Sequence, residues 1–333
     1  NASGFSYRDN NASTYIYMAI RAPMMVEPEA GSEVFKASDA SNGSSSPDSI
    51  SNFPVDMYFR RYVNTTNNTY LLTRLLGTNA LDTSATSAEA SFSTSSAGFD
   101  HNDGVMDIFS SSNTDFHTWM FKRAKGFFDV VAYTGNGTAG HTVNHSLGVA
   151  PEWIICKKRS SGGSFNDWYT VTSAYYNSNP YDRQSALNQL NGFTGGGFVS
   201  AADSTSFTIS NAYVGNENTY DFIAYLFASV SGVSKVGTYA GTGSAIDVDC
   251  GFSSGARFVY IQRADASGDG KYIWDTTRGI VTGNDPYLLL TSTSAEVTNT
   301  DYIDPLSSGF TVTSSAPAGL NTNGGTYFFL AIA

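Results

Sequence analysis

The sequence repeats itself with a period of slightly more than 100 residues, and this repeat limits the fold more than any other feature. Four segments share an aromatic and apolar run that ends on alanine: TYIYMAIRA (14–22), FHTWMFKRA (116–124), YDFIAYLFA (220–228) and TYFFLAIA (326–333). The last residues of the first three segments lie 102 and 104 positions apart. A fixed period indicates units of one fold arranged in tandem, so we predict modules of about 105 residues.

Other segments keep the same period. The pairs with offsets of 106 and 103 residues are GFFDVVAYTGNGT (126–138) with GVSKVGTYAGTGS (232–244), and SFTIS (206–210) with GFTVT (309–313). A third set consists of EWIICKKR (152–159), RFVYIQR (257–263) and, more loosely, VDMYFRR (55–61). Each member of this third set is an apolar run that closes on basic residues and passes into a polar loop.

These matches predict three modules, at 23–124, 125–229 and 230–333, of which the first is the most diverged. Residues 1–22 would be the closing strand of a preceding module or a linker, because they contain a closing run without a module body before it. The chain also lacks an initiator methionine, so we expect it to be the C-terminal part of a longer protein. Neither junction contains a Pro- or Ser-rich spacer, and we therefore expect the modules to pack directly into a stiff rod.

The predicted fold class is all-β. Short runs of Val, Ile, Phe, Tyr and Thr alternate with clusters of Gly, Asn and Ser, which is typical of antiparallel strands joined by turns. Each module should be an antiparallel β-sandwich or a jelly-roll-like unit. Only DRQSALNQL (182–190) suggests a short helix, and its counterpart at 285–292 looks extended. The polar segments 41–49 and 82–100 should be long surface loops.

Charge and cysteine content narrow the class of protein. The formal net charge of −11 and the pI near 4.7 argue against nucleic-acid binding, which needs clustered Lys and Arg. No apolar run approaches the ~18 residues that a membrane helix requires, so we expect no membrane insertion. The two cysteines, Cys156 and Cys250, fall in different modules and should be buried small hydrophobic residues rather than a disulfide.

The sequence contains no recognisable catalytic constellation. A nucleophile elbow, an HExxH motif and a phosphate-binding loop are all absent from it. His141 and His145 would chelate a metal on a helix, but they read as part of a strand, where such residues lie ~13 Å apart. An active site also seldom recurs in every module of an array. We therefore predict that the protein is not an enzyme and has no catalytic residues.

Two sets of residues are candidates for ligand binding. Asp265, Ser267 and Asp269 resemble a short Ca²⁺ loop, although a simple turn is the alternative interpretation. Calcium is the only cofactor that the sequence suggests. Five aromatic residues outside the expected strands are candidates for stacking against sugars, with a place in the core as the alternative. They are Tyr175, Tyr176, Tyr181, Trp274 and Tyr287.

The chain resembles a known group of viral proteins over nearly its whole length. The segments that carry the resemblance are TYIYMAIRAPM, WMFKRAKGFFDVVAYTGNGT, HSLGVAPEWIICKKRS, CGFSSGARFVYIQR and DYIDPLSSGFTVTSS. They are similar to the repeated C-terminal region of structural proteins from tailed bacteriophages, of the type common in marine phages, usually described as tail-fibre or virion proteins. In such proteins a lectin-like jelly-roll domain often precedes this region. The resemblance provides no catalytic residues.

The resemblance implies a virion structural protein, located in the extracellular virion, that forms part of a tail fibre or appendage and contributes to host attachment. The implied partners are other copies of the chain (a trimer by analogy with tail fibres), other virion proteins and host surface glycans. Two alternatives are a carbohydrate-binding lectin-like surface module and a capsid decoration protein. A polysaccharide depolymerase is a third, which the repetition and the missing catalytic constellation disfavour.

Overall fold

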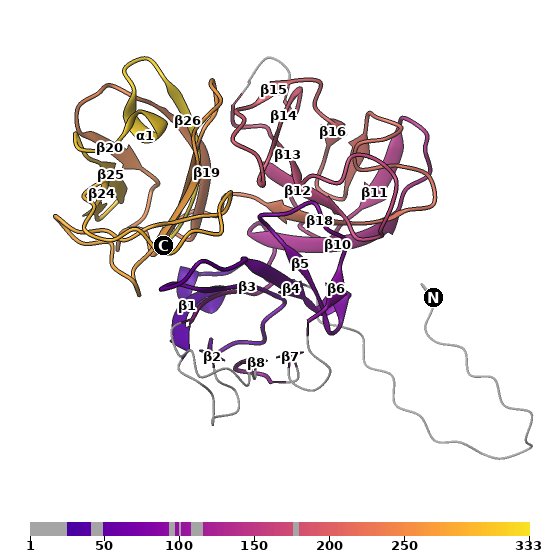
Figure 1. Ribbon diagram of the computed structural model, residues 1–333, viewed down its shortest axis with the longest axis horizontal. Helices are drawn as coiled ribbons and strands as arrows, with labels where there is room; N and C mark the ends of the chain where they lie inside the picture. The colour runs from indigo at the N-terminus through magenta and orange to yellow at the C-terminus, as the bar shows by residue number, and fades with distance from the viewer. Residues whose placement is uncertain (1–24, 41–48, 93–96, 100, 108–115, 176–179) are drawn as a thin grey trace, which may run out of the picture.

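The computed structural model describes residues 25–40, 49–92, 97–99, 101–107, 116–175 and 180–333 (Figure 1). These residues form 26 strands and three short helical segments, and every strand pairing is antiparallel. No helix within this part of the chain is long and apolar enough to cross a membrane. The protein is therefore all-β, as the sequence predicts.

Strands β1 to β9 form module 1, which consists of one large and one small sheet. The large sheet contains, in spatial order, β1 (Phe35–Ala40), β9 (Phe116–Phe121), β3 (Met57–Tyr62), β4 (Tyr70–Thr73), β5 (Asn79–Asp82) and β6 (Ala90–Ser91). The small sheet contains β2 (Ser49–Ile50), β8 (Gly104–Asp107) and β7 (Ala97–Gly98). Two 3₁₀ turns, η1 (Gly31–Glu33) and η2 (Arg74–Leu76), complete the module.

Modules 2 and 3 repeat this arrangement. The large sheet of module 2 contains β10 (Phe128–Thr134), β18 (Asp221–Phe227), β12 (Trp153–Lys158), β13 (Tyr169–Thr172), β14 (Arg183–Ala186) and β15 (Thr194–Gly195), and its small sheet contains β11 (His141–Asn144), β17 (Ser206–Ile209) and β16 (Val199–Ala202). In module 3 the large sheet contains β19 (Ser234–Ala240), β26 (Thr326–Ile332), β21 (Phe258–Arg263), β22 (Lys271–Asp275) and β23 (Leu288–Leu289). Its small sheet contains β20 (Ile246–Asp249), β25 (Gly309–Val312) and β24 (Ile303–Leu306), and a one-turn helix, α1 (Ala318–Asn321), precedes β26.

The apolar closing segments occupy equivalent positions in the three large sheets. Each of β9, β18 and β26 lies between the first strand of its module and the strand with the basic end, β3, β12 or β21. Every residue of β9 is buried, and so is every residue of β18 and β26 after the first. A strand that is covered on both faces is apolar throughout rather than alternating. The chain therefore ends on a central strand of module 3.

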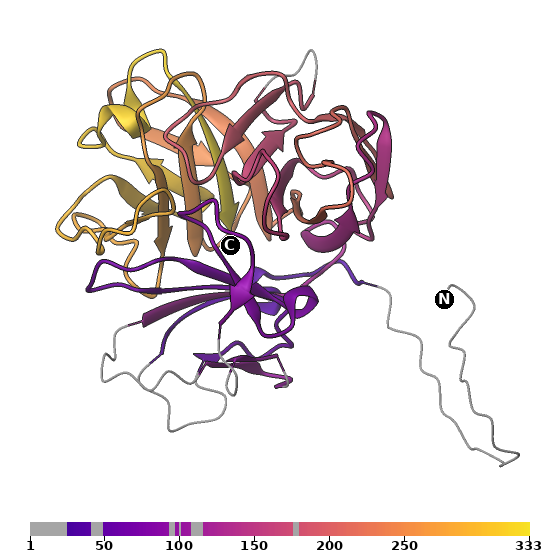
Figure 2. The same cartoon turned by 45° about the vertical axis from the view of Figure 1, so that its right-hand side comes forward.

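Each module has its own core between its two sheets. Representative residues from facing sheets are Leu72 and Val105 in module 1, Ile154 and Phe207 in module 2, and Val259 and Phe310 in module 3. The three modules are arranged around one centre (Figure 1, Figure 2). There the opposite faces of the three large sheets meet in one further core, which contains Phe121, Phe227 and Leu330. The rod that we expected is therefore wrong, because the three modules close around this shared core.

The structure also locates the predicted module junctions and the predicted helix. The predicted module junctions lie between β9 and β10 and between β18 and β19. The helix expected at 182–190 is wrong, because Arg183–Ala186 forms β14, which pairs with β13 and β15. Sheet pairing here overrides a weak local preference for helix. The segments 14–22 and 41–48 lie outside the described residues.

Candidate functional site

An equivalent backbone hydrogen bond occurs at each of the three interfaces between modules. In each case the acceptor is the carbonyl of the residue that follows β3, β12 or β21, and the donor is a backbone amide of a neighbouring module. The three bonds run from Glu89 N to Arg159 O (2.9 Å), from Phe193 N to Ala264 O (2.7 Å) and from Glu296 N to Val63 O (2.8 Å). They connect module 1 with 2, module 2 with 3, and module 3 with 1. The modules therefore form a closed ring with pseudo-threefold symmetry.

One basic residue near the end of β3 and one near the end of β12 reach across an interface to a neighbouring module. Arg61 Nη1 donates to Leu289 O at 2.8 Å, and its second terminal nitrogen donates to the carbonyl of Ser294. Lys157 Nζ donates to Thr86 O at 3.0 Å. Burial lowers the pKa of Arg61 to about 10 and that of Lys157 to about 8. These hydrogen bonds from buried side chains to backbone carbonyls fix the geometry of the two interfaces that module 1 makes.

A buried ionic cluster reinforces the interface between modules 3 and 1. The carboxylate of Asp275 accepts from Arg278 Nε at 2.7 Å and from Trp119 Nε1 at 2.9 Å, and it lies 3.2 Å from His117 Nε2. His117 Nδ1 contacts Asp39 Oδ1 at 2.5 Å. Burial lowers the pKa of His117, but the two carboxylates outweigh burial and raise it overall. Burial likewise raises the pKa of Asp275, but Arg278 and His117 hold it well below its usual range.

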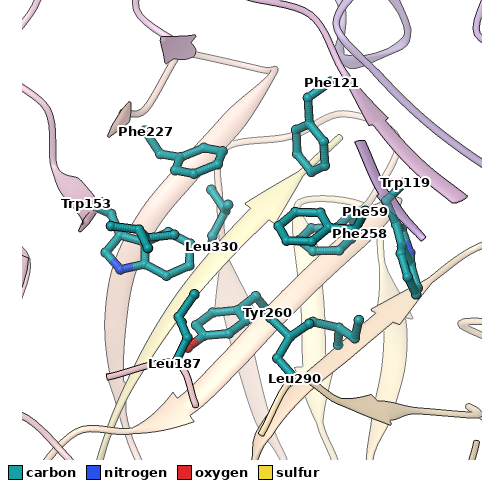
Figure 3. A pocket seen from close by; sticks show the side chains of 12 residues that line it. Phe59, Trp119, Phe121, Trp153, Leu187, Phe227, Phe258, Tyr260, Leu290 and Leu330 are labelled. Atoms are coloured by element: carbon teal, nitrogen blue, oxygen red, sulfur yellow. The ribbon is translucent and has the colours of Figure 1, made fainter. Parts of the chain in front are cut away.

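The centre of the ring contains a small apolar cavity of about 20 Å³ (Figure 3). Twelve side chains from all three modules line it, among them Phe121, Trp153 and Tyr260. This volume is at the lower limit for one water molecule, and a water there would find no polar partner in the lining. The cavity is therefore a dry packing defect where three sheets meet, and it offers no space for a ligand.

A wider hollow of about 450 Å³ lies beside residues 25–28 of module 1. Its lining contains Asp56 and Arg123, whose charges are already engaged. Arg123 Nε lies 2.6 Å from Asp129 Oδ1, and its backbone amide donates to Asp56 Oδ2 at 2.7 Å. Arg74 Nε lies 3.5 Å from the other oxygen of Asp56. These pairings stabilise the wall of the hollow and occupy the charges of Asp56 and Arg123.

The aromatic residues singled out from the sequence are mostly parts of the cores. Trp274 is fully buried, and Tyr181 is buried with its hydroxyl bonded to the carbonyl of Pro151. The burial of both rings favours the alternative interpretation of these two residues, a place in the core. Tyr175 and Tyr287 are half-buried against Phe193 and other rings. Tyr176 lies outside the described residues.

The carboxylates of the expected calcium loop are paired with a side-chain cation. Arg263 lies 3.0 Å from Asp265 and 3.7 Å from Asp269. Ser267 Oγ accepts from the backbone amide of Gly192 at 3.4 Å, so the hairpin contacts module 2. Within the described ranges, no group of three or more His, Cys, Asp or Glu side chains is placed to hold a metal ion. Calcium binding stays an untested prediction.

The two histidines and the two cysteines noted in the sequence all lie in described parts of modules 2 and 3. His141 begins β11 and contacts Asn216 Oδ1 at 2.7 Å, whereas His145 Nδ1 accepts from Leu147 N at 3.2 Å. The two rings therefore serve separate structural contacts. Cys156 and Cys250 are free and buried, as predicted, and burial raises the pKa of each thiol to about 12.

Sequence reasoning missed one pair of aromatic residues. Phe165 and Tyr213 of module 2 are exposed, and their ring centroids lie 5.9 Å apart. They lie 48 positions apart in two different loops, so their proximity could not be read from the sequence. A phenylalanine between SGGS and ND was the available signal, because a loop of this composition has no core to bury it.

Comparison with known proteins provides a family but no function. A family model described as a domain of unknown function (DUF7483) matches residues 30–333. The match begins immediately before η1 and covers all three modules. No curated protein matches the chain.

Proposed function

The chain belongs to the DUF7483 family, and we propose that it is a structural protein of a bacteriophage virion, part of a tail fibre or related appendage that contributes to host attachment. Its sequence resemblance to the repeated C-terminal region of tailed-phage structural proteins supports this role. The structural observation that carries the proposal is the closed ring, in which one shared core and three equivalent hydrogen bonds fix the modules relative to one another.

A ring of this kind suits a mechanical and adhesive role. Close-packed cores transmit force with little deformation, and here each large sheet is covered on both faces within one chain. Loops on the outside are thus held in fixed relative positions, which is the arrangement in which rigid scaffolds present binding loops. We propose other virion proteins and further copies of the chain as partners. A trimer, by analogy with tail fibres, would use outer surfaces, because the shared core is already closed.

Immunogold labelling of intact virions tests the proposal. The antibody is raised against the folded chain, and virions treated with pre-immune serum are the control. Label on the tail or its fibres is the expected result. Label spread over the head would replace the appendage with capsid decoration, and the absence of label from all particles would overturn the virion role.

A lectin-like surface module is the second candidate function. The observation that favours it is the exposed aromatic pair of Phe165 and Tyr213, because exposed rings in a protein that otherwise buries its aromatic residues mark an interaction site. The two candidates are compatible, since an appendage that attaches to a host can do so through a glycan.

A further inference from the structure

Two aromatic side chains of module 2 differ from all other aromatic residues that the structure describes. Phe165 is 42% exposed and Tyr213 is 60% exposed, whereas the other described rings are buried or half-buried. The two rings contact each other, with a centroid distance of 5.9 Å and an interplanar angle of 31°. Phe165 lies in the loop between β12 and β13, and Tyr213 lies in the loop between β17 and β18. We call this pair the aromatic platform.

Phe165 occupies a backbone conformation that disfavours a bulky residue. Its φ angle is +58°, in the left-handed region, where a side chain with a Cβ atom is strained. Module 3 shows what the repeat uses at this position. Tyr169 of module 2 corresponds to Tyr272 of module 3, because they pair with equivalent residues of β12 and β21. Phe165 lies four positions before Tyr169, and Gly268, with a φ of +105°, lies four positions before Tyr272. Module 2 therefore holds phenylalanine where its relative holds glycine.

Tyr213 is also specific to module 2. Asn216 and Asn321 are equivalent anchors, because the amide of each donates to the turn after the first strand of its module. Tyr213 lies three positions before Asn216, and Ala318 lies three positions before Asn321. If the loops are instead aligned on the ends of β17 and β25, the counterpart of Tyr213 is Ala316. Both members of the platform thus replace small residues of the repeat. Strained or exposed residues that the fold does not need are concentrated at functional sites.

The loop that carries Phe165 is held by an ion pair between the buried Lys158 and the half-buried Glu217. Lys158 Nζ donates to Ser164 O at 2.7 Å and to Glu217 Oε2 at 2.8 Å, and the Ser164 amide donates to Glu217 at 3.1 Å. The two charges neutralise each other. The exposed residues that precede Phe165 in its loop (161–164) and those that follow Tyr213 before β18 (218–219) are all Ser, Gly, Asn or Thr. The exposed side chains beside the two rings along the chain are therefore uncharged and rich in groups that can hydrogen-bond to hydroxyls.

We propose that the aromatic platform stacks against the pyranose rings of a neutral saccharide. The C–H bonds on the face of a sugar ring carry partial positive charge and are attracted to the negative face of an aromatic ring. Ser, Asn and Thr at the rim supply partners for the sugar hydroxyls. A rigid loop lowers the entropy cost of binding. This inference rests on the proposed attachment role and names the ligand class and the site through which attachment takes place.

The test is a titration of the purified chain with neutral saccharides, monitored by saturation-transfer difference NMR. The panel contains glucose, galactose, mannose, N-acetylglucosamine and their neutral oligosaccharides. Saturable binding to at least one of these is expected. Tyr213→Ala should weaken that binding roughly tenfold, as expected for the loss of one stacking ring. Tyr213→Phe should bind like the wild type, because it keeps the ring.

A matched control separates the platform from surface hydrophobicity in general. Val281 is 51% exposed in module 3, and Val281→Ala should leave saccharide binding unchanged. Circular dichroism melting curves of all variants establish that each one is folded. The proposal is overturned if no member of the panel binds, or if Tyr213→Ala binds as tightly as the wild type. It is also overturned if the platform instead mediates self-association that Tyr213→Ala abolishes.

The binding result and the virion result can be read separately. Saccharide binding by a chain that is absent from virions would support the platform and contradict the appendage. Label on the tail combined with no saccharide binding would support the appendage and contradict the platform.

Discussion

Replacement of Phe121 by alanine should weaken all three modules at once. Its ring lies in the shared core and has five aromatic neighbours from all three modules. These are Phe35 (5.0 Å), Phe59 (5.9 Å), Phe128 (6.0 Å), Phe227 (6.1 Å) and Phe258 (6.1 Å), measured between ring centroids. Phe121 is 1% exposed. Truncation of a buried phenylalanine costs about 3–5 kcal/mol, and the cavity at this position makes the upper half of that range the expectation.

Urea unfolding with hydrogen exchange read out by mass spectrometry measures this effect. In Phe121→Ala, the amides of β9, β18 and β26 should lose protection together, because one central strand of each module packs against the same core. The matched control is Phe310→Ala, which truncates a fully buried ring in the separate core of module 3. In that variant the loss of protection should start in the small sheet of module 3. If Phe121→Ala weakens only module 1 and leaves β18 and β26 protected, the shared core does not couple the modules.

Three further predictions concern single residues. Asp275→Asn should lower the free energy of unfolding by about 3 kcal/mol, because it removes the buried carboxylate that His117 and Arg278 share and leaves them only Asp39 and Glu296, one each; a loss below about 1 kcal/mol in urea titration would contradict this reasoning. Burial raises the pKa of Asp285 from 3.8 to about 7, so the folded state binds more protons than the unfolded state between these values. The free energy of unfolding should therefore fall as the pH rises from about 4 to about 7, and Asp285→Asn should flatten this decline in melting curves. Phe165→Gly should stay within about 1 kcal/mol of the wild type, because relief of left-handed strain offsets the lost packing; a larger loss in urea titration would show that the loop is not strained.

The strands were predictable because their signal is local. The closing segments are apolar throughout, and the structure places them as central strands that are buried on both faces. The repeat of slightly more than 100 residues also matched strands that hold equivalent places in the sheets, such as β10 with β19 and β17 with β25. The helix expected at 182–190 failed because this segment contains good helix formers, yet β14 gains its stability from pairing with β13.

The ring was not predictable from the absence of spacers, because short junctions fit a rod and a ring equally well. A better signal was available in the strands themselves. Trp153 to Cys156 is a continuous apolar run on β12, and such a run requires cover on both faces of the sheet. A rod would leave one face of each large sheet open to water, whereas a ring covers it.

The candidate site was harder to predict than the fold. Aromatic residue type alone does not separate Trp274, which is fully buried, from Tyr213, which is largely exposed. That difference depends on the tertiary position of each residue. Comparison between modules provides the missing information, since Gly268 marks the turn at which Phe165 is unusual.

A competition assay for host adsorption tests the central claim most directly. Host cells are incubated with increasing concentrations of the purified wild-type chain, then with virions, and the fraction of free virions is counted. The account predicts that the wild-type chain reduces adsorption in a saturable manner and that folded Tyr213→Ala does so only at roughly tenfold higher concentration. Adsorption that is unchanged at saturating wild-type chain would contradict the account.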